Sequence, residues 1–376
     1  MPKPRDIAPL SSETNPFIRK IDTPRGSTRF LNLKEILGPA DEHNFGILAA
    51  NAVVPEMLYA VLDAAFDYNS PLIIEVAESQ VGYALPGNGY KDKLTRFMDL
   101  AVNEVTKRAT KYQRMPLICM HIDHLQKDPD LAYVASEVGY TSVELDFSKQ
   151  PTTNRTEAVQ MNVEKCAPII EDLHTLGLSV EVEEGEIGSA QARSAQMREE
   201  IEAEVTRVDD AVLLVEGTNP EALAIFIGAA HGEIKGEPPI FYNRIGEVRK
   251  GLGQKGIDVP IVLHGGTGQT YKGFNEALNQ GARKFNYATR FWSILFDNLR
   301  QDEEGAAILK EMDSEAKRIG RSSRYVWVKY AEKLYSKVNP QTFRTAQKEI
   351  YDHVCELMEK AFLSQGMTSH YPLTPT

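Results

Sequence analysis

The sequence predicts an α/β fold, a (β/α)8 TIM barrel, and three observations support this prediction. Eight short apolar runs follow one another between residues 46 and 287, and helix-length amphipathic segments separate them. Eight such units in about 250 residues match the size of a closed barrel. Polar side chains stand at the carboxyl ends of the runs, where a barrel gathers them on one face. A doubly wound open sheet, the alternative, would spread them along an edge.

The expected elements follow a regular order along the chain. The predicted strands are residues 46–50, 72–76, 117–120, 142–145, 179–182, 222–227, 261–263 and 284–287. Helical patterns cover residues 55–68, 91–111, 156–176 and 272–280, and Gly139, Gly177 and Gly281 stand where helices should end. The polar residues at strand ends are Asn51, Glu75, Asp123, His124, Asp146, Glu183, His231, His264 and Asn286.

Three regions are expected along the chain. Residues 1–30 are rich in Pro, Ser and Thr and predict an N-terminal arm, and residues 31–300 would form the catalytic barrel. The pattern from 301 to 376 is helical and predicts a C-terminal extension packed on the barrel or on a partner subunit. The arm and the extension suggest a homodimer or a higher homo-oligomer.

Composition narrows the functional classes. The formal net charge of −11 argues against general nucleic-acid binding, although a local basic pocket for a phosphate remains compatible with it. Three widely spaced cysteines suggest neither a disulfide framework nor a cysteine-based zinc site. We see no export signal at the N-terminus and no apolar stretch long enough for a membrane span, so we expect a cytoplasmic protein.

Three histidines predict a metal site. His124, His231 and His264 each end a strand-like run, and three neutral imidazoles from different strands are the ligand set of a catalytic zinc with one open position. His121 precedes His124 by three residues, so the two need not share a face. The structural alternative is that these histidines only form hydrogen bonds at loop starts.

Two glycine-containing segments predict a phosphate site. His231 is followed by Gly232 and, three residues later, Lys235. His264 precedes Gly265, Gly266, Thr267 and Gly268 in the same way. Glycine lets backbone N–H groups approach an anion without a Cβ in the way, and phosphate-binding barrels usually use their last loops for this purpose. A glycine-rich turn without a ligand is the structural alternative.

The segments 121–124, 180–185, 231–235, 264–268 and 284–289 together resemble those of class II, zinc-dependent ketose-bisphosphate aldolases, in the same order. By that resemblance His124, His231 and His264 bind one catalytic Zn²⁺ per subunit, Asp123 transfers a proton, and Glu183 lies beside the metal. The resemblance also allows for a monovalent cation. The residues implied to hold the sugar phosphate or its carbons are Asn51, Gly232, Gly265, Thr267, Asn286 and Thr289.

The chain departs from the family pattern at several positions. Gln191 stands where the family has a loop glutamate that serves as acid or base, and Glu199 or Glu200 are candidates to replace it. Ala77 and Ala288 stand where polar substrate contacts are usual. Two further positions, Arg324 and Lys329, lie in a segment similar to one that supplies a basic residue to the far phosphate.

The resemblance implies reversible aldol cleavage of fructose 1,6-bisphosphate or a related ketose phosphate, through a zinc-stabilised enediolate of dihydroxyacetone phosphate. Two alternatives remain at this point: a non-catalytic aldolase-like subunit, and a metal-dependent phosphosugar epimerase. Asp123 together with three histidines favours the enzyme.

Overall fold

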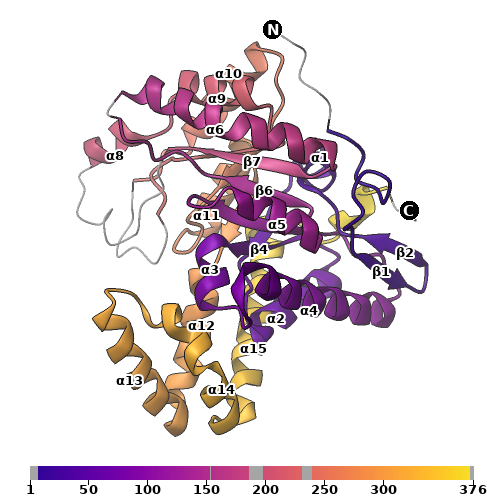
Figure 1. The fold of residues 1–376 in the computed structure, drawn as a ribbon, viewed down its shortest axis with the longest axis vertical. Coiled ribbons are helices and arrows are strands. Elements are labelled where there is room, and N and C mark those ends of the chain that lie inside the picture. Colours follow the sequence, from indigo (N-terminus) through magenta and orange to yellow (C-terminus); the bar gives the residue numbers. More distant parts are fainter. Residues whose placement is uncertain (1–6, 153, 186–197, 231–238, 373–376) are drawn as a thin grey trace.

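The computed structural model describes residues 7–152, 154–185, 198–230 and 239–372. Eight parallel strands close into a barrel in the order β10-β3-β4-β5-β6-β7-β8-β9 (Figure 1), which confirms the predicted (β/α)8 barrel. The strands are β3 (Ile47–Ala50), β4 (Leu72–Ala77), β5 (Ile118–Leu125), β6 (Ser142–Leu145), β7 (Ser179–Glu184), β8 (Ala222–Ile225), β9 (Ile261–Leu263) and β10 (Ala282–Tyr287). Every apolar run identified in the sequence contributes one strand.

Strand β5 is longer than predicted. The sequence pattern ended this strand at residue 120, but its pairing with β4 continues as Glu75 opposite His121 and Ala77 opposite Asp123. On its other edge the register with β6 shifts between Ile122 and Leu125, which marks a β-bulge. A bulge turns side chains away from the regular alternation of a strand, so it can re-aim a residue at a site.

Helices alternate with the barrel strands along the chain, and most of them cover the outward face of the barrel. They are α2 (Pro55–Tyr68), α3 (Glu78–Tyr83), α4 (Gly89–Tyr112), α5 (Asp130–Val138), α6 (Arg155–Thr175), α8 (Arg198–Glu204), α9 (Val208–Thr218), α10 (Asn243–Gln254) and α11 (Tyr271–Gln280). Helix α11 shows why these segments are helical. Thr270 caps its first turn by accepting from the Gly273 N–H, and Gly281 ends it at a φ of 110°.

The segment before the barrel packs on the amino ends of the strands of the same chain. It contains the hairpin of β1 (Lys20–Thr23) and β2 (Gly26–Arg29), followed by α1 (Leu33–Glu42). Asn32 and Glu35 form a capping box at the start of α1, and the Leu33 N–H donates to Ser179 Oγ at the start of β7. Helix α1 therefore closes the bottom of its own barrel, while the hairpin before it packs against α4.

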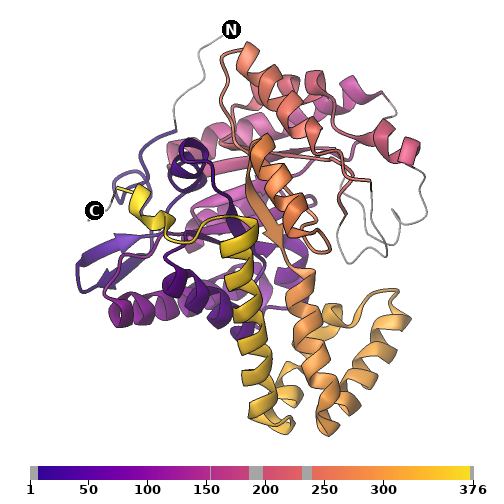
Figure 2. The ribbon, with the colours of Figure 1, turned by 180° about the vertical axis from the view of Figure 1, so that it is seen from behind.

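In the described chain, four α-helices follow the barrel: α12 (Thr289–Gln301), α13 (Glu303–Arg318), α14 (Trp327–Lys337) and α15 (Pro340–Glu356). Figures 1 and 2 show α13, α14 and one end of α15 projecting to one side of the barrel, while α15 runs along α2. Aromatic rings hold the projection together, among them Trp292 against Trp327. The short helix η1 (Ser323–Val326) lies between α13 and α14. Within the described ranges, no helix is long and apolar enough to span a membrane.

Candidate active site

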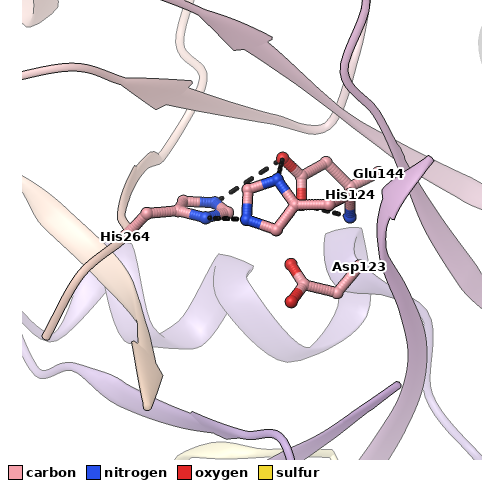
Figure 3. A group of neighbouring side chains, drawn as sticks. All are labelled: Asp123, His124, Glu144 and His264. Carbon is pink, nitrogen blue, oxygen red and sulfur yellow. Dashed lines mark hydrogen bonds and ion pairs between the residues drawn. The ribbon is translucent and has the colours of Figure 1, made fainter. Parts of the chain in front are cut away.

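The bulge in β5 sets the position of His124. This residue has a φ of 52°, in the left-handed region that non-glycine residues rarely adopt, and its backbone N–H donates to Glu144 Oε2 at 3.0 Å. Because that N–H bonds a side chain from β6, the backbone at His124 leaves the regular ladder. Its imidazole then faces the ring of His264, which follows β9 (Figure 3).

The two imidazoles face each other through one nitrogen atom of each ring. His264 Nε2 lies 3.1 Å from Glu181 Oε1, which places its proton on Nε2 and leaves a lone pair on Nδ1. His124 Nδ1 lies 3.3 Å from Asp146 Oδ2, which leaves the lone pair of the neutral ring on Nε2. His124 Nε2 and His264 Nδ1 are 3.0 Å apart. If both rings were neutral, these two lone pairs would face each other and repel, so a proton or a metal ion between the rings stabilises the arrangement.

Asp123 lies beside the pair of rings and is held by two amides. Asn51 Nδ2 donates to its Oδ2, and Asn286 Nδ2 donates to its Oδ1, each at 3.0 Å. Burial raises the pKa of Asp123, but nearby positive charges and a hydrogen bond from Glu144 hold this pKa well below its usual range. The Asp123 side chain is therefore an ionised carboxylate with a fixed direction, as a proton acceptor requires.

Three further carboxyl groups surround His124. Its Nδ1 lies 3.5 Å from Glu144 Oε1 and 3.6 Å from Glu183 Oε2, in addition to the contact with Asp146. Burial lowers the pKa of His124, but Asp123, Asp146 and Glu183 outweigh burial and raise this pKa to about 10. A field that favours a proton on the ring also favours a divalent cation there.

Glu183, the predicted metal-proximal carboxyl, lies within the same cluster. Its Oε2 is 4.0 Å from His264 Nδ1. Burial raises the pKa of Glu183 well above its usual range, and the Asp146 charge adds to this shift. Glu183 Oε2 is buried and has no hydrogen-bond partner within the part of the chain that the structure describes. A cation at the site would supply the missing partner.

Charged side chains also lie beneath these groups, inside the barrel. Lys284 is fully buried and forms ion pairs with Glu75 and Glu181. Burial raises the pKa of Glu181, but the charge of Lys284 and the hydrogen bond from His264 outweigh burial and lower this pKa to about 2. Burial lowers the pKa of His121 to about 3, so this ring is neutral; its Nδ1 lies 2.7 Å from Ser142 Oγ, and its Nε2 lies 3.9 Å from both Glu75 and Glu181.

The glycines after His264 allow close backbone contacts. Gly265 has a φ of 67°, and a Cβ there would lie 2.6 Å from the Ala230 carbonyl oxygen. A Cβ on Gly266 would lie 2.7 Å from the Asn286 carbonyl oxygen. That carbonyl accepts the Gly266 N–H at 3.3 Å, so this N–H serves the fold rather than an anion. Thr267, which follows Gly266 in this loop, is buried.

Several predicted residues lie outside the described ranges. These are His231, Gly232, Lys235 and Gln191. Their predicted roles, including the third histidine ligand, stay predictions. Glu199 and Glu200 are described, and both are exposed on α8.

Of the two basic candidates near the C-terminus, only Arg324 reaches the site region. Its Nη1 donates to Thr289 Oγ1 at 3.3 Å, at the first residue of α12. Lys329 forms an ion pair with Glu315 on α13, at 2.7 Å. Ala288 precedes α12 without a side-chain cap, and the Thr289 hydroxyl and the Arg324 guanidinium meet at this helix start.

Comparisons with known proteins are consistent with this site geometry. The family model described as Fructose-bisphosphate aldolase class-II matches residues 31–366. The chain belongs to this family. As a member it is an aldolase, a carbon–carbon lyase.

Relatives of this aldolase are named after more than one substrate. A Bacillus subtilis (strain 168) protein named "Probable fructose-bisphosphate aldolase" is 30% identical over 261 residues, which cover 69% of this chain and 81% of the relative. A protein named "Sulfofructosephosphate aldolase" from Alkalicoccus urumqiensis is 26% identical over 272 residues, covering 72% and 85%. The fructose-bisphosphate aldolase of Helicobacter pylori is 29% identical over 233 residues, covering 61% and 67%.

Solved structures share the fold of this aldolase. The YdjI aldolase from Escherichia coli K12 aligns with a TM-score of 0.64 at 21% identity, over 90% of this chain and 99% of that one. The fructose-bisphosphate aldolase from Campylobacter jejuni aligns with a TM-score of 0.62 at 17% identity, over 92% and 97%.

Sequence reasoning about this aldolase overlooked three buried charged residues: Glu144, Glu181 and Lys284. A usable signal was present in the spacing. Successive strand residues point to opposite faces, so residues two apart share a face. Glu144 precedes Asp146 by two residues, Glu181 precedes Glu183, and Lys284 precedes Asn286. Charged or polar residues that lie two positions apart in otherwise apolar strands indicate a polar barrel interior.

Proposed function

We propose that the chain is a metal-dependent aldolase that reversibly cleaves a phosphorylated ketose, with Zn²⁺ as the metal and dihydroxyacetone phosphate as the three-carbon product. The observation that carries the proposal is the pair of facing imidazole nitrogens of His124 and His264, 3.0 Å apart, with the Asp123 carboxylate beside them. Family membership supplies the reaction class.

The donor set fits a zinc ion. Ligand atoms of His124, Glu144 and His264 lie within 4.8 Å of one another, with the proton-accepting Asp123 beside them, and imidazole nitrogen with carboxylate oxygen is a common zinc environment. His231, predicted as the third imidazole ligand, would complete the set. The carboxylate of Glu181 behind His264 is the outer partner that a metal-bound histidine usually has.

The chemistry follows from the position of Asp123. When bound, a divalent ion would polarise the ketone as a Lewis acid and stabilise the enediolate that carbon–carbon cleavage leaves. Asp123 accepts the proton of the C4 hydroxyl while the C3–C4 bond breaks and its electron pair moves toward the ketone. The aldehyde then departs, and the remaining enediolate takes up a proton from water at C3 to become dihydroxyacetone phosphate. Asn51 and Asn286 hold the carboxylate in one direction during this transfer. In condensation, Asp123 returns the proton to the aldehyde oxygen.

A phosphorylated substrate is supported by the region around Thr289. Its hydroxyl, the start of α12 and the Arg324 guanidinium lie together, and each favours an anionic group. Fructose 1,6-bisphosphate is the default substrate. Because one relative is named as a sulfofructosephosphate aldolase, the sulfonated analogue is included as a second candidate.

The proposal is tested by incubating the purified, zinc-loaded protein with a panel of ketose phosphates that includes both candidates. We expect release of a triose phosphate from at least one ketose, with one zinc bound per subunit. Zinc binding without cleavage of any ketose phosphate would contradict the proposal. Inversion of a sugar carbon without cleavage would favour an epimerase.

A further inference from the structure

Lys284 is a buried cation that the proposed reaction does not use. It lies in β10 two residues before Asn286, so both side chains point into the barrel. Its Nζ lies 2.7 Å from Glu75 Oε1 and 2.9 Å from Glu181 Oε2, and it donates to Asn286 Oδ1 at 2.9 Å. An ammonium group has three protons, and here it meets three oxygen atoms.

The contact with Asn286 determines the direction of its amide. An ammonium group can only donate, so the amide oxygen must face Lys284 and the amide nitrogen must face the other way. On that other side, Asn286 Nδ2 donates to Asp123 Oδ1 at 3.0 Å. Asp123 as a carboxylate only accepts, so both contacts require the same amide orientation. Lys284 thereby fixes the donor that holds the proton-accepting carboxylate.

The contact with Glu181 leads to the metal site by a second path. One oxygen of this carboxylate meets Lys284, and the other lies 3.1 Å from His264 Nε2. Glu181 thus holds the His264 proton on Nε2 and leaves Nδ1 as the atom that faces His124. Outer partners of this kind fix both the tautomer and the direction of a metal-binding histidine.

We propose that Lys284 is a positioning residue that aligns the metal-binding nitrogen of His264 with the proton-accepting carboxylate of Asp123. It acts through Glu181 on one side and through Asn286 on the other, and it touches neither the metal nor the sugar. This role rests on the proposed metal-dependent aldol cleavage.

The plainer explanation is a buried ion pair that only stabilises the barrel. Glu75 offers a matched control, because it pairs with the same ammonium but is a member of neither path to His264 or Asp123. Substitution Glu75→Gln perturbs the buried ion pair and leaves both paths intact. Substitution Lys284→Met removes both paths while retaining a side chain of similar length.

The first measurement needs neither metal nor turnover. Long-range ¹H–¹⁵N NMR spectra of the metal-free proteins report which nitrogen of His264 carries the proton. We expect the Nε2–H tautomer in the unmodified protein and in Glu75→Gln. In Lys284→Met, the Glu181 carboxylate loses the contact that fixes its direction, so we expect a mixture of tautomers.

The second measurement compares metal affinity and kinetics. Loss of an outer partner typically costs about 10–100-fold in metal affinity or activity. We therefore expect zinc to bind Lys284→Met about 10–100-fold more weakly than Glu75→Gln, the visible spectrum of the cobalt-loaded protein to change, and kcat to fall more than KM rises.

If Lys284→Met does not fold, Glu181→Gln tests the metal path alone, with the same change of tautomer and about 10-fold weaker zinc binding expected. An unchanged tautomer and zinc affinity in a folded Lys284→Met or Glu181→Gln would overturn the proposal, and so would equal effects in Glu75→Gln. If the unmodified protein binds zinc but cleaves no ketose phosphate, the proposed function fails, while the tautomer and affinity results still decide the role of Lys284.

Discussion

His124 Nε2 lies 3.0 Å from His264 Nδ1, and the other nitrogen of each ring faces a carboxylate. Such a contact is unfavourable unless a proton or a metal ion lies between the rings. The surrounding carboxyl groups of Asp123, Glu144 and Glu183 make the location strongly favourable for a cation. This relationship connects the fold to the proposed metal chemistry.

The two histidines of the β5 segment should behave differently when substituted. We expect His124→Asn to lose more zinc affinity than the roughly 10–100-fold that an outer partner contributes. His121→Asn should retain its zinc and lose about 1–3 kcal/mol of unfolding free energy, because the buried hydrogen bond to Ser142 is disturbed. Metal content after dialysis and chemical denaturation measure these effects. Equal loss of zinc from both variants would contradict the assignment.

Removing the proton acceptor should abolish most turnover while the metal remains. Asp123→Asn keeps the shape of the side chain but cannot take the C4 hydroxyl proton, so we expect kcat to fall about 10²–10⁴-fold. Zinc content should stay near that of the unmodified protein. The matched control is Asp209→Asn, an exposed position at the start of α9, which should leave kcat unchanged. Nearly full activity in Asp123→Asn would exclude this residue as the base.

Arg324 and Lys329 should differ in their effect on substrate binding. Arg324→Met removes the guanidinium beside Thr289, and a hydrogen bond to a charged group contributes about 1.5–3 kcal/mol. We expect KM for the phosphorylated substrate to rise about 10–100-fold. Lys329→Met removes a largely exposed cation that pairs with Glu315, so KM should stay within about 2-fold. Steady-state kinetics on both variants would refute the assignment if the two KM values rose equally.

Glu184 should make the stability of the protein depend on pH. Burial raises the pKa of this carboxyl from 4.5 to about 7, and contacts with Thr206 and Arg155 offset the shift only in part. Between about pH 4.5 and pH 7, Glu184 is protonated in the folded state and ionised in the unfolded state. The stabilising contribution is therefore complete below about pH 4.5 and is lost as the pH rises through 7.

Substitution of Glu184 by Gln should remove this dependence. From pH 5 to pH 8 we expect the unfolding free energy of the unmodified protein to fall about 2–3 kcal/mol more than that of Glu184→Gln. Exposed Glu359 gives the control, since Glu359→Gln should follow the unmodified protein. Denaturant titrations across this pH range make the comparison. Parallel curves for Glu184→Gln and the unmodified protein would show that Glu184 does not carry the effect.

The barrel could be predicted because its signal is local and repeated. Apolar runs with helix-length spacers recur eight times, and the polar residues that end them, such as Asp123, His264 and Asn286, lie together at one end of the closed sheet. Only closure brings these distant positions together, but the number of units was sufficient to indicate it.

The network of buried charged residues inside the barrel could not be predicted from the sequence in the same way. The pattern of residues 142–145 predicts an apolar strand, although Glu144 lies within it. The face of a strand that points inward depends on register, which a single sequence does not specify. The bulge that turns His124 toward His264 depends on pairing between β5 and β6, and Arg324 meets Thr289 across 35 residues of chain. These relations arise from tertiary contacts.

The central claim is that aldol cleavage at this site depends on the metal. The direct measurement is the rate of triose phosphate release from the ketose that the protein cleaves best, before chelation, after chelation, and after stoichiometric zinc is returned. We predict full loss of cleavage on chelation and recovery with one zinc per subunit. Cleavage that continues unchanged in protein shown to contain no divalent metal would contradict the account.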